Sequence, residues 1–398
     1  MPGPPHPISV VCSDLSENCL GRAQVLAEVL AAFGPVRIVG PQLGSSIWRP
    51  ASSSRIAMSS FEMRSVLGYA NARGWLRSQL AGSRVVVSKP RSTSFGLALA
   101  AGVSPSRMLL DIDDWELGFM TPGANESVGA WWSRNVQLLV PKSLNSYGGI
   151  RALDAICGRV ARRSVSNSWL QQRFGGVLLP HVRDTTELDP ARFGEAGRAR
   201  RSEQRMDGRS WVAFIGTIRE HKGVDDLLKA IASLPGDDAP GLLLAGVDFE
   251  HAFSKALLAE AQQTLPESRL RVVGAFAGRD LPSWVAAADV LCIPSRDIPG
   301  AWGQIPAKLF DAMAMARPIV ASDVNDMGRI LDGCGLVFPA GDVAALGARL
   351  LELTSNPELG ARLGIRARER AIQQYSVESG RLSMAELIAE VPVFLPSR

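Results

Sequence analysis

Short apolar runs alternate with amphipathic runs along most of this chain, and this alternation constrains the fold more than any other feature. The clearest case lies within residues 289–323, where an apolar run at 289–293 leads into a loop rich in proline. A helical pattern follows from about Gln304 to Ala316, and 318–322 is a second short apolar run. Strand, loop, helix and strand in this order predict a βαβ unit, in which ligands bind at the strand-to-helix loop.

The same pattern occurs in both halves of the chain. In the first half it predicts strands at Ile8–Cys12, Val36–Val39, Val85–Val87, Met108–Leu110, Val160–Ser164 and Val177–Leu179, and helices at Arg22–Phe33, Ser94–Ala101 and Trp169–Phe174. In the second half it predicts further strands at Trp211–Ile215, Gly241–Ala245, Leu270–Val273 and Gly335–Phe338, and further helices at Val224–Leu234, Phe253–Gln262, Leu281–Ala287, Val343–Leu353, Pro357–Gln374 and Val377–Val391. Residues 122–145 have no clear period, and here we expect a loop-rich insertion with a short helix near Trp131.

A polar stretch separates the two halves. Residues 191–210 are basic and almost free of large apolar side chains, a composition that predicts a linker. We therefore expect an N-terminal domain at 1–190, a C-terminal domain at 211–375 and a last helical segment at 376–398. Alternating strands and helices on both sides of a linker predict an α/β fold of two Rossmann-like, doubly wound parallel-sheet domains facing a cleft.

Composition and simple motifs exclude several classes of protein. A net charge of +4 is small for 398 residues and does not favour nucleic-acid binding. The five cysteines have no CxxC spacing, so we expect buried thiols without a disulfide framework or a metal site. No apolar run reaches the roughly 20 residues that a membrane-spanning helix needs, and the start, MPGPPHP, lacks a signal pattern, so a cytoplasmic location is expected. A dinucleotide site would need GxGxxG after the first strand, where only Gly21 is present.

The order and spacing of five segments resemble the retaining GT-B glycosyltransferases of the glycogen-synthase-like family four. The resemblance covers nearly the whole chain. The segments are SDLSENCLGRAQVLAEVL at 13–30, LPHVRDT at 179–185, FIGTIREHKGVDDLLKAI at 214–231, LPSWVAAADVLCIPS with PAKLFDAMAMARPIVASD at 281–295 and 306–323, and GLVFPAGDVAALGARLLEL at 335–353.

This resemblance implies a hexosyl-type transferase in which the C-terminal domain holds a nucleoside-diphosphate sugar. It implies an acceptor with a hydroxyl group, such as a saccharide, a lipid-linked saccharide or a small natural product, bound by the N-terminal domain. The last helix is then expected to return to the N-terminal domain. No cofactor or tightly bound metal is implied, and a peripheral contact with a membrane stays open.

A diphosphate leaving group requires positive charge close to the bond that breaks. Lys222 matches the phosphate lysine of the family, and Arg219 in the same loop is expected to assist it. The loop begins at Gly216, and Thr217 stands where the family often has an arginine, so both are included in the expected donor site. Two solvated loop cations remain the alternative.

The helix expected from Gln304 adds further donor contacts. Its free N–H groups favour an anion, and Gly300, Gly303 and, in the other domain, Gly21 let the backbone approach the ligand. Asp311 matches the second glutamate of the paired-glutamate motif of the family, which implies a contact with the ribose hydroxyls. Lys308 lies one turn earlier on the same face, and a surface Lys–Asp pair is the alternative for these two residues.

The sequence departs from the family at the first glutamate of that motif. Gly303 stands eight residues before Asp311, where the family has a carboxylate that contacts the donor sugar. Losing a charged hydrogen bond costs about 1.5–3 kcal/mol, so another group is expected to substitute. Gln304 and Asp297 are the nearest candidates.

Acidic residues cluster at the end of the strand predicted at Met108–Leu110. We expect Asp113 or Asp114 to contact the acceptor or the donor sugar at the edge of the active site, because Asp113 falls where many members of the family carry a histidine. Lys89 and Arg91 are weaker candidates on the acceptor side. Two alternatives stay open, namely a cluster that only caps loops, and a metal-binding Asp-x-Asp formed by Asp111 and Asp113.

Three other activities are compatible with these residues. A nucleotide-sugar epimerase would bind the donor and need no acceptor, and a sugar phosphorylase would use or release free phosphate. A non-catalytic nucleotide-sugar-binding partner subunit is the third, because Gly303 replaces a glutamate. Binding without turnover would favour this third activity.

Overall fold

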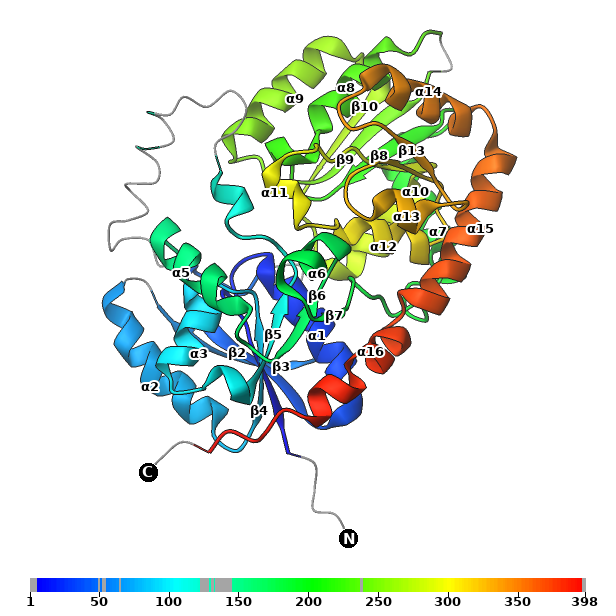
Figure 1. Cartoon of the computed structure of the whole chain (residues 1–398). Coiled ribbons are helices and arrows are strands. Elements are labelled where there is room, and N and C mark those ends of the chain that lie inside the picture. The colour runs from blue at the N-terminus through cyan, green and yellow to red at the C-terminus, as the bar shows by residue number, and fades with distance from the viewer. Residues whose placement is uncertain are drawn as a thin grey trace. The chain divides into compact units, whose positions relative to one another are not determined.

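The computed structural model describes residues 6–48, 51, 55–63, 66–121, 129, 132, 145–236 and 239–395. The chain forms two compact units (Figure 1). Unit 1 contains Met1–His181, Trp302–Gln304 and Val377–Arg398, and unit 2 contains Val182–Ala301 and Ile305–Ser376. Each unit is built on one parallel sheet, so the expected α/β fold with two sheets is confirmed.

Unit 1 contains a seven-stranded sheet in the order β3-β2-β1-β4-β5-β6-β7, in which all neighbours are parallel. The central strands are buried on both sides, as expected for a sheet covered by helices on both faces. The strands are β1 (Ile8–Val11), β2 (Val36–Gln42), β3 (Ala57–Glu62), β4 (Arg84–Ser88), β5 (Met108–Ile112), β6 (Arg162–Val165) and β7 (Val177–Leu178).

The helices of unit 1 divide between the two faces of this sheet. One apolar cluster joins residues of α2, α3, α5 and α6 to the strands. α1 packs against β1, β2 and α16. The helices are α1 (Cys19–Leu30), α2 (Tyr69–Leu80), α3 (Leu97–Ala100), α5 (Tyr147–Cys157), α6 (Ser168–Phe174) and α16 (Val377–Ala389).

Unit 2 contains a six-stranded parallel sheet in the order β10-β9-β8-β11-β12-β13. The strands are β8 (Trp211–Ile215), β9 (Gly241–Val247), β10 (Leu270–Gly274), β11 (Val290–Ile293), β12 (Ile319–Ser322) and β13 (Leu336–Phe338). Two apolar clusters line it, one with α10, α12 and α13 and the other with α8, α9 and α14. The helices are α7 (Pro190–Glu203), α8 (Val224–Ser233), α9 (Ala252–Thr264), α10 (Leu281–Ala287), α11 (Pro299–Trp302), α12 (Ala307–Ala314), α13 (Met327–Leu331), α14 (Val343–Thr354) and α15 (Pro357–Gln374).

Each sheet has one point at which the strand order reverses. In unit 1 this point lies between β1 and β4, and in unit 2 it lies between β8 and β11. Ligands of open parallel sheets bind beyond the carboxyl ends of the strands at such a point. The predicted site loops follow these strands, so the topology supports the placement of a site in each unit.

The segment expected to be a linker is largely helical. α7 spans Pro190–Glu203 and packs against α10, where a Cβ on Gly197 would lie 2.7 Å from the side chain of Ala286. Asp189 caps the helix by accepting from Ala191 N at 3.0 Å. The linker prediction is wrong because polar arginines, not an apolar stripe, hold this helix in place. Arg201, for example, pairs with Asp289 at 2.8 Å.

The helix expected from about Gln304 to Ala316 is α12, which is shorter and spans Ala307–Ala314. Pro306 interrupts the pattern, because the residue before a proline avoids helical geometry. The free N–H groups at the start of α12 are therefore those of Ala307 and its successors, not that of Gln304.

Other elements differ from the expectation or were missed. The polar edge strand β3 and the helices α2, α5, α11 and α13 were not predicted. The helix expected near Trp131 lies outside the described residues. All five cysteines are buried, as predicted. Within the described part of the chain, no helix has the length and apolarity needed to cross a membrane.

Candidate functional site

The site in unit 2 starts where β8 ends. Gly216 has a φ of 127°, a conformation that glycine adopts readily, and a Cβ here would lie 3.3 Å from Lys308 Nζ. Thr217 follows, and Lys222 Nζ donates to both its carbonyl and its hydroxyl oxygen at 2.8 Å. Gly216, Thr217, Lys222 and Lys308 therefore meet at one turn beyond the carboxyl end of β8.

Lys308 is the unusual residue of this group. Its Nζ is shielded from solvent, lies 3.3 Å from the centroid of the Phe214 ring, and has no hydrogen-bond partner among the described residues. Burial, and then the positive charge of Lys222, lower the pKa of Lys308 well below its ordinary value. A buried ammonium group without a partner is unfavourable, so this turn is prepared to receive an anion.

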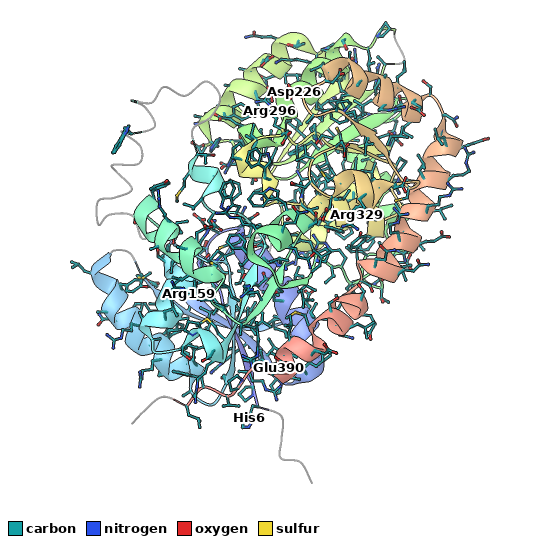
Figure 2. The ribbon with its side chains drawn as sticks, viewed as in Figure 1. His6, Arg159, Asp226, Arg296, Arg329 and Glu390 are labelled. Atoms are coloured by element: carbon teal, nitrogen blue, oxygen red, sulfur yellow. The ribbon has the colours of Figure 1, made fainter. Side chains whose placement is uncertain are left out.

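The loop after β11 is tied to the loop after β8. A Cβ on Gly223, which has a φ of 62°, would lie 2.0 Å from the carbonyl oxygen of Pro294, so only glycine allows this approach. Arg296 N donates to His221 O at 3.0 Å, and Arg296 Nε lies 3.3 Å from Asp226 Oδ2 (Figure 2). These contacts fix the two loops at the reversal point of the sheet.

The remaining residues expected to bind the donor in unit 2 have protein partners or lie on helices. Arg219 pairs with Asp248 at 3.2 Å, in the loop after β9. Asp311 is buried on α12 and accepts from Arg183 Nε. Gly300 lies within α11. Arg219 and Asp311 are thus held in fixed positions, and their roles toward a ligand stay predictions.

The site in unit 1 is organised around Lys89, directly after β4. Lys89 has a φ of 69°, which non-glycine residues rarely adopt, and Ser94 Oγ donates to its carbonyl oxygen at 2.6 Å. Its ammonium group pairs with Asp114, lies 3.0 Å from Asp113 Oδ1 and 3.9 Å from Glu116 Oε1. The weak acceptor-side candidate Lys89 is therefore the centre of a buried ionic cluster.

The carboxylates of this cluster outnumber its cations. Arg91 pairs with Glu116 at 2.9 Å, so three carboxylates face two basic side chains. Burial, together with repulsion from Asp114, raises the pKa of Asp113 to about 7 although Lys89 opposes this rise. Burial would also raise the pKa of Asp114, but the attraction and hydrogen bond of Lys89 outweigh burial and lower it. The pKa of Asp113 therefore lies near neutral pH.

Asp111 belongs to a separate pair. Arg22 Nε donates to its Oδ2 at 2.8 Å and Arg22 Nη2 to its Oδ1 at 2.7 Å, and Ser164 Oγ donates to Oδ1 at 2.7 Å. Both oxygens of Asp111 are engaged and the residue is fully buried. These partners speak against the alternative in which Asp111 and Asp113 together ligate a metal.

Trp302–Gln304 group with unit 1. A Cβ on Gly303 would lie 2.5 Å from the backbone nitrogen of Trp115, so this position has no room for a side chain. Gln304 Nε2 donates to Asp114 Oδ1 at 3.0 Å, which places the amide beside the ionic cluster. Gly303 and Gln304 are therefore packed against residues of unit 1.

Gly21 and a group of three tryptophans complete the description of unit 1. Gly21 lies in the first turn of α1, and a Cβ there would lie 3.4 Å from the ring of Trp48, an ordinary contact. Trp115, Trp169 and Trp302 form an aromatic cluster that sequence reasoning missed. No sequence signal connects these three residues, because their proximity depends on the order of the strands.

Comparisons with known proteins bear on the family and the fold. The family described as Glycosyl transferases group 1 matches residues 209–356. An alpha-D-kanosaminyltransferase from Streptomyces kanamyceticus is 25% identical over 201 residues, which is 48% of this chain and 50% of the relative. A phosphatidyl-myo-inositol mannosyltransferase from Mycobacterium leprae is 31% identical over 233 residues, which is 56% of each protein. The chain thus spans about half the length of these curated relatives.

The similarity to a solved structure covers more of the chain than the sequence similarity does. Anabaena HepE, solved in complex with UDP-glucose, superposes with a TM-score of 0.75 at 14% identity, covering 96% of this chain and 99% of HepE. At this identity the likeness shows the fold alone. Together with the two parallel sheets, this likeness shows a GT-B fold, and residues 209–356 are similar to the group 1 glycosyltransferases.

Proposed function

We propose that this protein is a retaining, metal-independent glycosyltransferase that moves a sugar from a nucleoside-diphosphate sugar to a hydroxyl acceptor. In this reaction the bond between the anomeric carbon and the diphosphate breaks, and a bond to the acceptor oxygen forms on the same face of the sugar. The acceptor proton passes to the departing phosphate oxygen. Retention and metal independence follow from the resemblance to family four.

The observation that carries the proposal is the pair of lysines at the end of β8. Lys222 and Lys308 both face the turn at Gly216 and Thr217, and the Lys308 ammonium group is buried without a hydrogen-bond partner in the described residues. A diphosphate would supply the missing acceptor and would favour the charged form of Lys308. The same contacts strengthen as the leaving group gains charge.

The ionic cluster of unit 1 supports the acceptor side. Asp113, whose pKa is raised to about 7, can in its deprotonated form accept a hydrogen bond from the acceptor hydroxyl, whose proton passes to the departing phosphate oxygen. Lys89 holds Asp113 and Asp114 in position through the contacts described above. We assign Asp113 and Asp114 to the acceptor side and Lys222 to the departing diphosphate.

The names of the similar proteins support the substrate classes. HepE was solved with UDP-glucose, which supports a nucleotide-sugar donor. One relative is named as a kanosaminyltransferase and another as a phosphatidyl-myo-inositol mannosyltransferase, which supports either a small natural product or a lipid-linked acceptor. The lipid acceptor would place the protein at a membrane surface.

The test is a titration with UDP, GDP, ADP and dTDP followed by isothermal calorimetry in buffers of different ionisation enthalpy. We expect one diphosphate to bind with proton uptake, because the bound anion raises the lowered pKa of Lys308. Lys222→Ala should weaken this binding at least tenfold, since a charge-assisted contact of about 1.5–3 kcal/mol is lost. Unchanged affinity would contradict the assignment of the phosphate site.

A non-catalytic, nucleotide-sugar-binding partner subunit is the second candidate. The observation in its favour is the packing of Gly303 on Trp115, which leaves no room for the family glutamate. Donor hydrolysis and transfer assays with many acceptors separate the two functions. Tight donor binding with neither reaction would support the second.

A further inference from the structure

The chain enters and leaves unit 2 at neighbouring points. Unit 2 starts at Val182 and ends at Ser376. Arg183 N donates to Tyr375 O at 2.8 Å, and Arg183 forms an isolated parallel bridge with Ser376. Entry and exit are therefore hydrogen-bonded to one another through the backbone of Arg183.

The side chain of Arg183 reaches from this point to α12. Its Nε donates to Asp311 Oδ1, and its Nη2 donates to Ala307 O at 3.0 Å. The side chains of Arg183 and Asp311 are only 16% and 9% exposed, so water screens this ion pair poorly. One residue thus connects the entry to unit 2 with the helix expected to bind the donor.

A second set of contacts strengthens the connection. Arg368 donates to Leu188 O at 2.8 Å and also to Ala314 O, at the far end of α12. The rings of Phe310 and Tyr375 lie 4.9 Å apart, which joins the middle of α12 to the exit segment. α12 is therefore held along its length by residues near the entry and exit of the unit and by Arg368 of α15.

The ion pair with Arg183 engages one of the two carboxylate oxygens of Asp311. Oδ1 accepts from Arg183, whereas Oδ2 has no hydrogen-bond partner within the residues that the structure describes. A carboxylate offers acceptor sites on both oxygens. A fixed guanidinium on one oxygen orients the other, because the planar group and the short aspartate stem restrict rotation.

We propose that Arg183 is a positioning residue for ribose recognition. It holds Asp311 through one oxygen and presents the other to a ribose hydroxyl of the donor. The inference rests on the proposed function, and it changes the expectation that Asp311 uses both oxygens for the ribose. Ribose binding is thereby coupled to the segment at which the chain enters unit 2.

The experiment measures ribose selectivity in the full-length protein. UDP, GDP and ADP are each titrated beside their 2′,3′-dideoxy analogues, which lack the hydroxyl groups that Asp311 would bind. For the wild type we expect the ribose form to bind at least tenfold more tightly, since a charge-assisted hydrogen bond is lost in the analogue. In Arg183→Met the preference should fall close to unity with little change in binding of the dideoxy form.

Matched variants separate positioning from a general structural role. Asp311→Asn should lose the same preference, the double variant should lose no more than either single one, and Arg183→Lys should retain part of it. Arg192→Met is the control, because Arg192 is an exposed arginine near the entry to unit 2 whose partners among the described residues are Glu187 at 3.3 Å and Thr186 O at 3.1 Å. If Arg183→Met does not fold, Arg183→Lys and Asp311→Asn carry the comparison.

The outcomes are distinguishable. Equal weakening of the ribose and dideoxy forms, or an unchanged preference, would overturn the positioning role and leave the proposed function standing. A wild type that binds none of the three diphosphates would overturn both.

Discussion

Replacing Lys308 by methionine should move stability and ligand affinity in opposite directions. Methionine keeps the length and the apolar stem of the side chain but removes the ammonium group. That group is buried over Phe214 and has no hydrogen-bond partner among the described residues. The protein without ligand should therefore become more stable, while the site loses a cation that faces the diphosphate.

Both magnitudes follow from the environment of Lys308. An unsatisfied buried polar group costs about 1–3 kcal/mol, and the contact with Phe214 offsets about 0.5–2 kcal/mol of this. We expect a net gain of about 1 kcal/mol, or a rise of about 2–4 °C in the melting temperature of unit 2. Loss of a charge-assisted contact of about 1.5–3 kcal/mol should weaken diphosphate binding by about tenfold to a hundredfold.

Differential scanning calorimetry without ligand and titration calorimetry with UDP, GDP and ADP measure the two effects. Lys229→Met is the matched control, because Lys229 is an exposed lysine of α8 that, among the described residues, pairs with Asp225 alone, at 4.0 Å. This control should change neither quantity appreciably, since surface pairs contribute about 0–1 kcal/mol. A Lys308→Met protein that loses stability and keeps its affinity would refute the reasoning, because Lys308 would then act only through its contact with Phe214.

Three further predictions concern unit 1 and the metal question. The pKa of Asp113 is raised from 3.8 to about 7 on folding, so its contribution to stability is fully present below about pH 4 and is lost as the pH rises through 7. Denaturant titrations at pH 5 and pH 8 should therefore show a fall in the free energy of unfolding that is smaller in Asp113→Asn than in the wild type. Gly303→Ala should destabilise unit 1 by about 1–3 kcal/mol through collision with Trp115, whereas Gly74→Ala, in an open part of α2, should stabilise it by about 0.5–1 kcal/mol in the same thermal melts. Sugar transfer should persist in excess EDTA; complete loss that Mg²⁺ or Mn²⁺ restores would instead support a metal site.

The elements with a clear apolar period were predictable from the sequence. Every strand of unit 2, for example, lies within two residues of its expected range, because buried parallel strands are continuous apolar runs. α7 escaped prediction because its contacts with the rest of unit 2 rely on arginines and on Gly197, which leave no apolar stripe. The start of α12 at Ala307, later than the expected Gln304, was readable from Pro306, but the helical period of the neighbouring residues concealed it.

The candidate site was only partly predictable, for a physical reason. Sequence order places Lys222 after a strand, but only the packing of α12 on the sheet shows that Lys308 is buried beside it. Likewise, the role of Lys89 depends on β4 and β5 being neighbours, which sets Lys89 against Asp113. Strand order and burial are properties of the whole sheet, and local patterns do not contain them.

The chain enters and leaves unit 2 at neighbouring residues, and this bears on whether unit 2 can fold on its own. Both of its apolar clusters are formed entirely by residues between 188 and 375, and its two ends are already joined by hydrogen bonds at Arg183. A unit with its own core and adjacent ends has the properties of a cassette that can be excised or inserted as one piece. Residues 182–376, which also contain the segment Trp302–Gln304 that groups with unit 1, thus form a natural fragment for testing the proposed nucleotide binding, with Lys222, Lys308 and Asp311 all retained.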